Sequence, residues 1–115
     1  MFDFEKLTVY KKAKEFNGIV RSYITTNNLD KITKDQFRRA SFSIVLNIAE
    51  GSGRFSKRDR KNFCVISRSS AFECIAIIDV LKDEGLIQDD LFTSLYQLGE
   101  EISKILLKMI KNLSD

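Results

Sequence analysis

The chain has 115 residues, of which 43% are hydrophobic and 30% charged, and its formal net charge is +3. This profile is ordinary for a soluble globular protein and fits one domain, residues 1–115. No apolar run approaches the roughly 20 residues that a membrane span needs. Proline is absent and glycine is scarce, which favours long helices, and the amino terminus is unlike a signal peptide, so we expect a cytoplasmic helical protein.

The first helix is predicted over about residues 4–26. Asp3 is its expected N-cap, and Asn27 and Asn28 are good terminators because asparagine tolerates the left-handed conformation. Apolar residues recur at spacings of three and four, which is typical of a helix with one buried face. They are Phe4, Leu7, Tyr10, Ala13, Phe16, Val20, Tyr23 and Ile24.

The second helix is predicted from Thr33 to about Gly51. Thr33 and Gln36 match a capping box, in which the threonine caps the helix and the glutamine reaches back. Its inner face is marked by Phe37, Ala40, Ile44 and Ile48. The break at Gly51-Ser52-Gly53 is interpreted as a flexible turn, because a phosphate loop would end in Gly-Lys-Ser/Thr and follow a strand.

The third helix is predicted from Ser56, its N-cap, to Glu84, with Gly85 in the left-handed position beyond it. Its second half, residues 71–81, is apolar in most directions around the axis. A helix of this kind must be covered on more than one side, and one small chain offers too little protein to do so. We therefore predict a subunit interface, whose residues are Phe72, Ile75 and Ile78.

The fourth helix is predicted over about residues 89–113, with acids at its start and lysines near its end, as the helix macrodipole favours. Four helices with short connections predict an all-α, up-down-up-down antiparallel four-helix bundle. Cys64 and Cys74 lie ten residues apart on one predicted helix, about 15 Å along its axis, too far for a disulfide. They are interpreted as small buried hydrophobic residues instead of a redox pair or metal site.

Charge is unevenly distributed along the chain. Residues 34–68 carry nine basic side chains against three acidic ones, so this segment is +6 and the remainder −3. Residues 54–61 place cations at the start of the third helix, where the macrodipole disfavours them. Binding of an anion such as phosphate would explain this placement, although a merely solvated helix end is the alternative. The predicted nucleic-acid contacts are Arg38, Arg39, Arg54, Lys57, Arg58, Arg60, Lys61 and Arg68.

Phe55 lies inside this basic cluster. Its ring either stacks on an unpaired base or plugs the end of the bundle, and the sequence leaves both open.

Asn47, Glu50 and Glu73 are polar residues near apolar helix faces. Antiparallel pairing of the second and third helices about a midpoint between residues 53 and 54 brings a cation level with each. The predicted pairs are Glu50 with Lys57, Asn47 with Arg60, and Glu73 with Lys34. We interpret them as structural salt bridges and a buried amide that fix the helix register. A carboxylate active site would need a second partner, and the chain lacks histidine, the usual general base and zinc ligand, so we expect no enzyme, metal or cofactor.

Several motifs in this layout resemble one family. They are Phe4-Glu5-Lys6-Leu7, Gln36-Phe37-Arg38-Arg39-Ala40, Ser43-Ile44, Asn47-Ile48-Ala49-Glu50-Gly51, Arg54 with Ser56, and Ser70-Ala71-Phe72-Glu73. They resemble the four-helix bundle proteins, also called 23S rRNA intervening-sequence proteins, over nearly the whole chain; Ser69 departs from the family's usual glycine. The resemblance implies a cytoplasmic bacterial protein that forms a closed ring, commonly a pentamer. A related branch serves diversity-generating retroelements, binding reverse transcriptase and nucleic acid.

The sequence therefore leaves two alternative functions open. The first is a homo-oligomeric ring that binds RNA or DNA through the basic residues, and such binding weakens steeply with salt. The second is a protein–protein adaptor ring that docks a partner enzyme such as a reverse transcriptase, with nucleic acid incidental.

Overall fold

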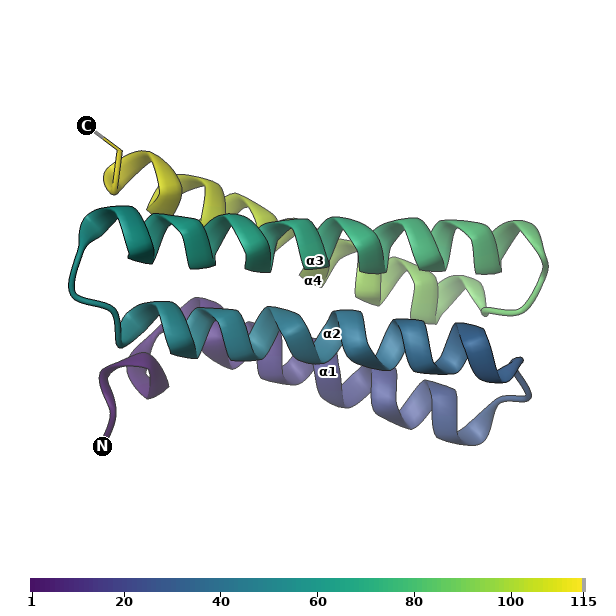
Figure 1. Cartoon of the computed structure of the whole chain (residues 1–115). Coiled ribbons are helices and arrows are strands. Elements are labelled where there is room, and N and C mark those ends of the chain that lie inside the picture. The colour runs from purple at the N-terminus through teal and green to yellow at the C-terminus, as the bar shows by residue number, and fades with distance from the viewer. Residues whose placement is uncertain (115) are drawn as a thin grey trace.

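Four long helices dominate the computed structural model, which describes residues 1–114. A short 3-10 turn, η1 (Asp3–Lys6), precedes α1 (Thr8–Thr26), α2 (Lys31–Ser52), α3 (Lys57–Asp83) and α4 (Asp89–Asn112). The helices alternate in direction, so both termini lie near the α2–α3 loop at one end, while the α1–α2 and α3–α4 connections lie at the other (Figure 1). The predicted all-α antiparallel four-helix bundle is confirmed.

The core lies between the apolar faces of the four helices. Each helix contributes fully buried side chains, among them Phe16 of α1, Phe37 of α2, Ile78 of α3 and Leu95 of α4. The most extensive packing joins α2 to α3 and α3 to α4, while α1 lies against α2 and α4. The inward faces that the spacing of three and four predicts are therefore confirmed.

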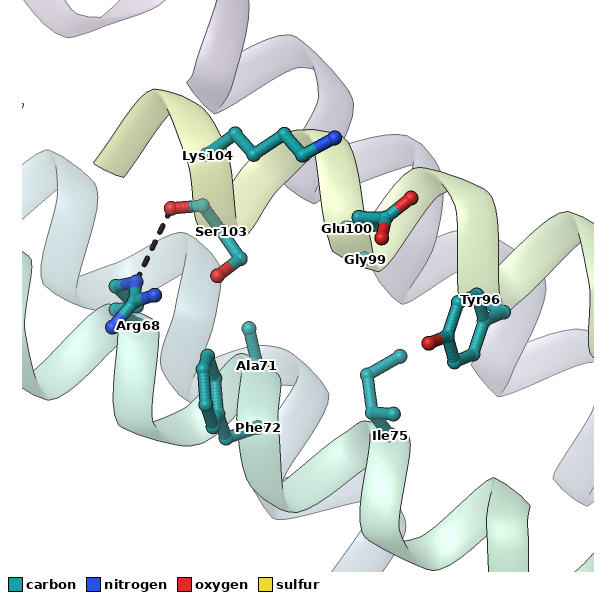
Figure 2. Close-up of a pocket in the computed structure, with 9 residues that line it drawn as sticks. All are labelled: Arg68, Ala71, Phe72, Ile75, Tyr96, Gly99, Glu100, Ser103 and Lys104. Carbon is teal, nitrogen blue, oxygen red and sulfur yellow. Dashed lines mark hydrogen bonds between the residues drawn. The ribbon is translucent and has the colours of Figure 1, made fainter. Parts of the chain in front are cut away.

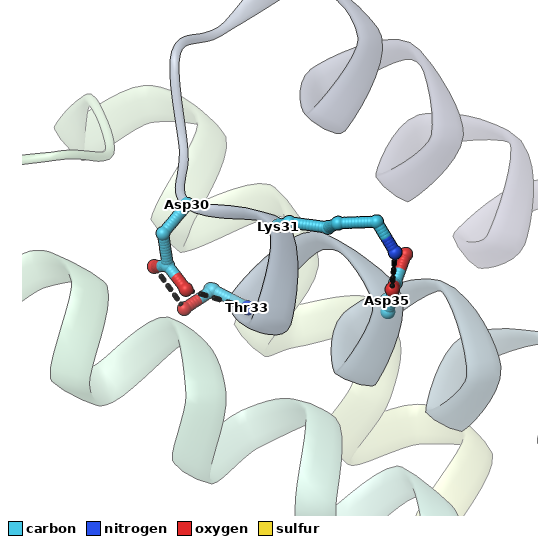
Figure 3. A network of polar contacts seen from close by, with 4 residues as sticks. All are labelled: Asp30, Lys31, Thr33 and Asp35. Atoms are coloured by element: carbon cyan, nitrogen blue, oxygen red, sulfur yellow. Dashed lines mark hydrogen bonds and ion pairs between the residues drawn. The ribbon is translucent and has the colours of Figure 1, made fainter.

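Local hydrogen bonds decide where α2 and α3 start, and the cap predicted for α2 is wrong. Ser56 caps α3 as expected, because its hydroxyl accepts a hydrogen bond from the backbone N–H of Asp59 at 3.1 Å. At the start of α2, however, the carboxylate of Asp30 accepts from the backbone N–H of Thr33 at 3.0 Å and from its hydroxyl (Figure 3). Thr33 therefore lies within the first turn. The N-cap is Asp30, three residues before the predicted one, because aspartate is itself a strong N-cap.

One further helix end differs from prediction and another agrees. Leu7 has extended backbone angles, φ −72° and ψ 130°, so α1 begins after it and Asp3 lies in η1 instead of capping α1. At the end of α3, Gly85 has the predicted left-handed conformation, with φ +70°. The N–H of Leu86 donates to the carbonyl of Leu81 at 2.9 Å, which completes the helix-terminating motif that glycine permits.

Serine side chains join α2 to α3. The hydroxyls of Ser43 and Ser70 lie 2.8 Å apart, and the buried hydroxyl of Ser67 donates to the carbonyl of Ile44 at 2.9 Å. These contacts displace α3 relative to α2 by about one turn from the register that a midpoint between residues 53 and 54 predicts. Buried hydroxyls require partners, so these contacts outweigh a register estimated from loop symmetry alone.

The subunit interface predicted on α3 needs one correction. Ile78 is fully buried in the chain's own core, because α2 and α4 together cover more of α3 than its sequence suggested. Ile75 is partly buried and packs against that core. Phe72 is 55% exposed, and it is the only one of the three that presents a largely open apolar surface.

Cys64 and Cys74 are free and buried. Burial raises the thiol pKa of both, because an apolar environment disfavours the thiolate. Their interpretation as small hydrophobic residues is confirmed.

Candidate nucleic-acid interface

A short loop, residues 53–56, carries the basic stretch out at one end of the bundle. The backbone N–H groups of Gly53 and Arg54 donate back to the carbonyls of Glu50 and Gly51 at 3.1 and 3.2 Å. From the other side, Nε of Arg60 in α3 donates to the carbonyl of Arg54 at 2.6 Å. These bonds tie the loop to both of its helices and fix its conformation.

Arg54 is engaged with the bundle. Its guanidinium lies 4.7 Å from the ring centroid of Phe63 and 3.3 Å from the carboxylate of Glu50. The predicted pairing of Glu50 with Lys57 is therefore wrong, because Arg54 is one helical turn beyond Glu50 and reaches it first. Arg54 holds the loop in place and offers less of its charge to a ligand.

The cations that follow Arg54 in the sequence are not neutralised by acidic side chains of the described residues. Lys57, Arg58 and Arg60 are exposed, and Lys61 is partly exposed. Among residues 1–114, none of these four forms an ion pair with a carboxylate. Arg60 also donates to the carbonyl of Arg54, so the charges most open to a ligand are those of Lys57, Arg58 and Lys61. We call the surface of Lys57, Arg58, Arg60 and Lys61 the basic end.

The other three predicted contacts lie away from the basic end. Arg38 and Arg39 are exposed on α2, roughly 20 Å along the helix axis from the loop at 1.5 Å per residue. Arg68 packs against α4: its Nε donates to the carbonyl of Ser103 at 3.3 Å, and its guanidinium lies 4.6 Å from the ring centroid of Phe72. The structure therefore brings together only part of the predicted set.

Asn47 and Glu73 have partners other than the predicted cations. The amide of Asn47 donates to the carbonyl and hydroxyl of Ser43, at 2.8 and 2.9 Å, within its own helix. The carboxylate of Glu73 accepts from the side-chain amide of Gln36 at 3.0 Å, so its predicted pairing with Lys34 is wrong. Both corrections follow from the displaced register of α2 and α3.

The antiparallel topology sorts charge between the two ends of the bundle. The end with the α2–α3 loop gathers the first turns of α3 and the last turn of α4 (Figure 1). Among residues 1–114, its cations are Lys6, Lys11, Arg54, Lys57, Arg58, Arg60, Lys61, Lys108 and Lys111, against the acids Asp3, Glu5, Glu50 and Asp59. The opposite end has the acids Asp30, Asp35, Asp79, Asp83, Glu84, Asp89 and Asp90, against Lys31, Lys34 and Lys82. Helices far apart in sequence thus make one end basic and the other acidic.

A hollow of about 350 Å³ lies between α3 and α4 (Figure 2). Phe72 and Tyr96 line it and remain 55% and 44% exposed. Ile75 packs so closely on Gly99 that a Cβ there would lie 2.7 Å from its Cδ1. We call this surface the α3–α4 groove; it combines exposed aromatic rings with Arg68.

Comparison with known proteins identifies the family. The family model for the 23S rRNA-intervening sequence protein matches residues 5–108. The chain belongs to this family. A protein of unknown function from the S23 ribosomal protein family of Bacteroides thetaiotaomicron VPI-5482 has a similar crystal structure, with a TM-score of 0.84 and 27% identity over 90% of this chain and 99% of that one. A search among curated proteins finds no match.

The family match over residues 5–108 confirms the resemblance that the motifs predict. Across residues 1–114, no helix is long and apolar enough to cross a membrane, and no cluster of three or more acidic or cysteine side chains could hold a metal ion. Sequence reasoning missed Tyr96 as part of an exposed surface. The available signal was an aromatic residue on the fourth helix outside the inward stripe that contains Leu95 and Leu98.

Proposed function

We propose that this chain is a non-enzymatic, cytoplasmic nucleic-acid-binding protein that works as a homo-oligomeric ring. The observation that carries the proposal is the basic end, whose cations Lys57, Arg58 and Lys61 have no carboxylate partner among the described residues. A surface of free Lys and Arg side chains suits a polymer that repeats negative charge along its length. The family's name, which refers to an intervening sequence in 23S rRNA, makes RNA the first probe to test.

The ring is proposed from exposed apolar surface on α3 and α4. Phe72 and Tyr96 line the α3–α4 groove together and are 55% and 44% exposed, and exposed apolar surface of this kind is typical of protein interfaces. A head-to-tail contact that closes produces a ring, and the family resemblance implies that such rings are commonly pentamers. A ring would repeat the basic end once in each subunit and so bind several stretches of one strand together.

The binding test compares two sets of neutralised lysines and arginines. Fluorescence anisotropy with a labelled RNA at about 50 mM salt should show binding that weakens steeply as salt rises. A triple variant, Lys57→Gln, Arg58→Gln and Lys61→Gln, should bind less tightly, and its log–log salt slope should fall by about 2. Absence of binding by the unchanged protein at low salt would contradict the proposal.

A matched control removes the same charge from the other end. The triple variant Lys31→Gln, Lys34→Gln and Lys82→Gln lowers the net charge equally, at the acidic end. It should bind RNA as the unchanged protein does. If both triple variants lost the same affinity, net charge alone would explain binding and the basic end would have no special role.

Light scattering tests the ring. A monomer has a mass of 13.3 kDa, so a ring gives an integral multiple of it. Phe72→Glu introduces a charge on a side chain that is already exposed, so the bundle should stay folded while the oligomer dissociates. A monomeric mass for the unchanged protein would contradict the proposed ring.

The α3–α4 groove supports one competing function, an adaptor that docks a protein partner. Apolar docking is strengthened by kosmotropic salt such as sulfate, whereas phosphate contacts are weakened by salt. A partner that stays bound to the ring at high salt, together with no RNA binding at low salt, would favour the adaptor.

A further inference from the structure

Phe55 is fully exposed, at 101% of its reference area, at the tip of the α2–α3 loop. The possibility that it plugs the end of the bundle is therefore excluded. A ring of this size that stays in water forgoes the stabilisation that burial in the core would give it. Phe55 makes no contribution to the core of the free chain, and contact with a partner would give the ring a role.

The loop holds this ring outward. On one side of Phe55, the carbonyl of Arg54 accepts from Nε of Arg60 at 2.6 Å. On the other side, Ser56 accepts from the backbone N–H of Asp59 and caps α3. Because both neighbouring residues are fixed, the direction in which the Phe55 side chain leaves the backbone is fixed as well.

The surroundings of Phe55 decide what kind of partner fits. Lys57 and Arg58 are exposed beside it and, within residues 1–114, have no ion-pair partner. An apolar protein pocket that covered the ring would also bring these charges out of water, at considerable cost. A nucleotide in a single strand offers a flat base for the ring and a phosphate for each cation.

We infer that Phe55 stacks on an unpaired base of single-stranded nucleic acid, with the neighbouring phosphates against Lys57, Arg58 and Lys61. This inference rests on the proposed nucleic-acid binding and adds a preference for single strands. Bases in a duplex are already stacked on one another and are not available to the ring, so duplex binding uses the cations alone.

The first test removes the ring. Against unstructured oligothymidine and oligouridine of about 20 nucleotides, Phe55→Ala should bind about 5-fold more weakly or worse, because one stacked base contributes at least this much. Its affinity for a duplex of the same length should be unchanged. The control is Phe42→Ala, which removes another exposed phenylalanine, 40% exposed on α2, and should leave all affinities unchanged. The two oligomers also show whether the strand is DNA or RNA.

The second test makes the contact visible. The chain contains no tryptophan, so Phe55→Trp places one reporter at the proposed contact, and an exposed site tolerates the change. A base stacked on the indole should quench its fluorescence, over the same concentrations at which anisotropy reports binding. A duplex should bind without quenching.

The outcomes separate this inference from the proposal beneath it. If the unchanged protein bound neither single-stranded nor duplex nucleic acid, both the proposed nucleic-acid binding and the stacking of Phe55 would be contradicted. If it bound single strands, and Phe55→Ala bound them equally well with no quenching of the tryptophan variant, stacking alone would be overturned. A lower mass of Phe55→Ala by light scattering would instead make Phe55 a subunit contact and would also overturn the inference.

Discussion

Gly51 provides a sharp test of how α2 and α3 fit together. It closes the Asn-Ile-Ala-Glu-Gly block on which the family resemblance depends, and it is buried. A Cβ built on it would lie 2.8 Å from the Cβ of Phe63, well inside van der Waals contact. Since that atom is attached directly to the α3 backbone, no side-chain rotation relieves the clash, and one helix must move.

The expected effect of Gly51→Ala is a net loss of stability. Overpacking a tight contact costs about 1–3 kcal/mol. Alanine is about 1 kcal/mol better than glycine inside a helix, and this gain is only partly realised at the last turn of α2. The free energy of unfolding should therefore fall by about 1–2 kcal/mol, which lowers Tm by about 4–8 °C in a domain of this size.

The matched control is the same substitution at Gly18. This glycine is exposed in the middle of α1, and a Cβ there would have no atom within 4 Å. Gly18→Ala should therefore raise stability by about 0.5–1 kcal/mol, through helix propensity alone. Urea unfolding followed by circular dichroism, at one protein concentration, measures both variants. Equal shifts of the same sign would refute the packing argument.

Three further predictions concern buried and capping groups. Ser67→Ala removes the hydroxyl that donates to the carbonyl of Ile44 at 2.9 Å and should cost about 0.5–1.5 kcal/mol in the same urea assay; an unchanged midpoint would contradict that role. Cys64 and Cys74, whose thiol pKa values are raised by burial, should react with a thiol reagent at pH 8 far more slowly in the native protein than in urea; equal rates would show that they are accessible. The pKa of Asp30 is lowered by its hydrogen bonds to Thr33, so its stabilising effect is present above its unfolded pKa and is lost as pH falls through the lower, folded pKa; Asp30→Asn should make Tm less sensitive to acid, and parallel pH profiles would argue against this.

The helix ends show how well capping residues can be predicted from the neighbouring sequence. Ser56 and Gly85 lie where their cap positions were predicted, because a cap needs only residues within one turn. The prediction that Thr33 caps α2 was wrong for an equally local reason. Asp30 competes for the same free backbone N–H groups, and its carboxylate is a good acceptor. Where two capping residues are three apart, the sequence alone does not decide between them.

Partners across helices were harder to predict. Glu50 and Glu73 were assigned cations from a symmetric loop, but Gly51 allows α3 close to α2, and Ser67 and Ser70 hold it about one turn away from that register. A slide of this size changes which side chains are level while leaving every apolar face inward. Hydrophobic periodicity therefore carries no information about it.

The sequence by itself determined the four helices, their inward faces, the antiparallel order and the concentration of charge at residues 54–61, because all of these follow from composition, periodicity and short connections. Only the tertiary structure decided that Ile78 is inside and Phe72 outside, and that Phe55 points into water instead of closing the bundle. Each of these depends on how far a helix is rotated and shifted against its neighbours. That is set by packing between residues far apart in the chain, which no local pattern records.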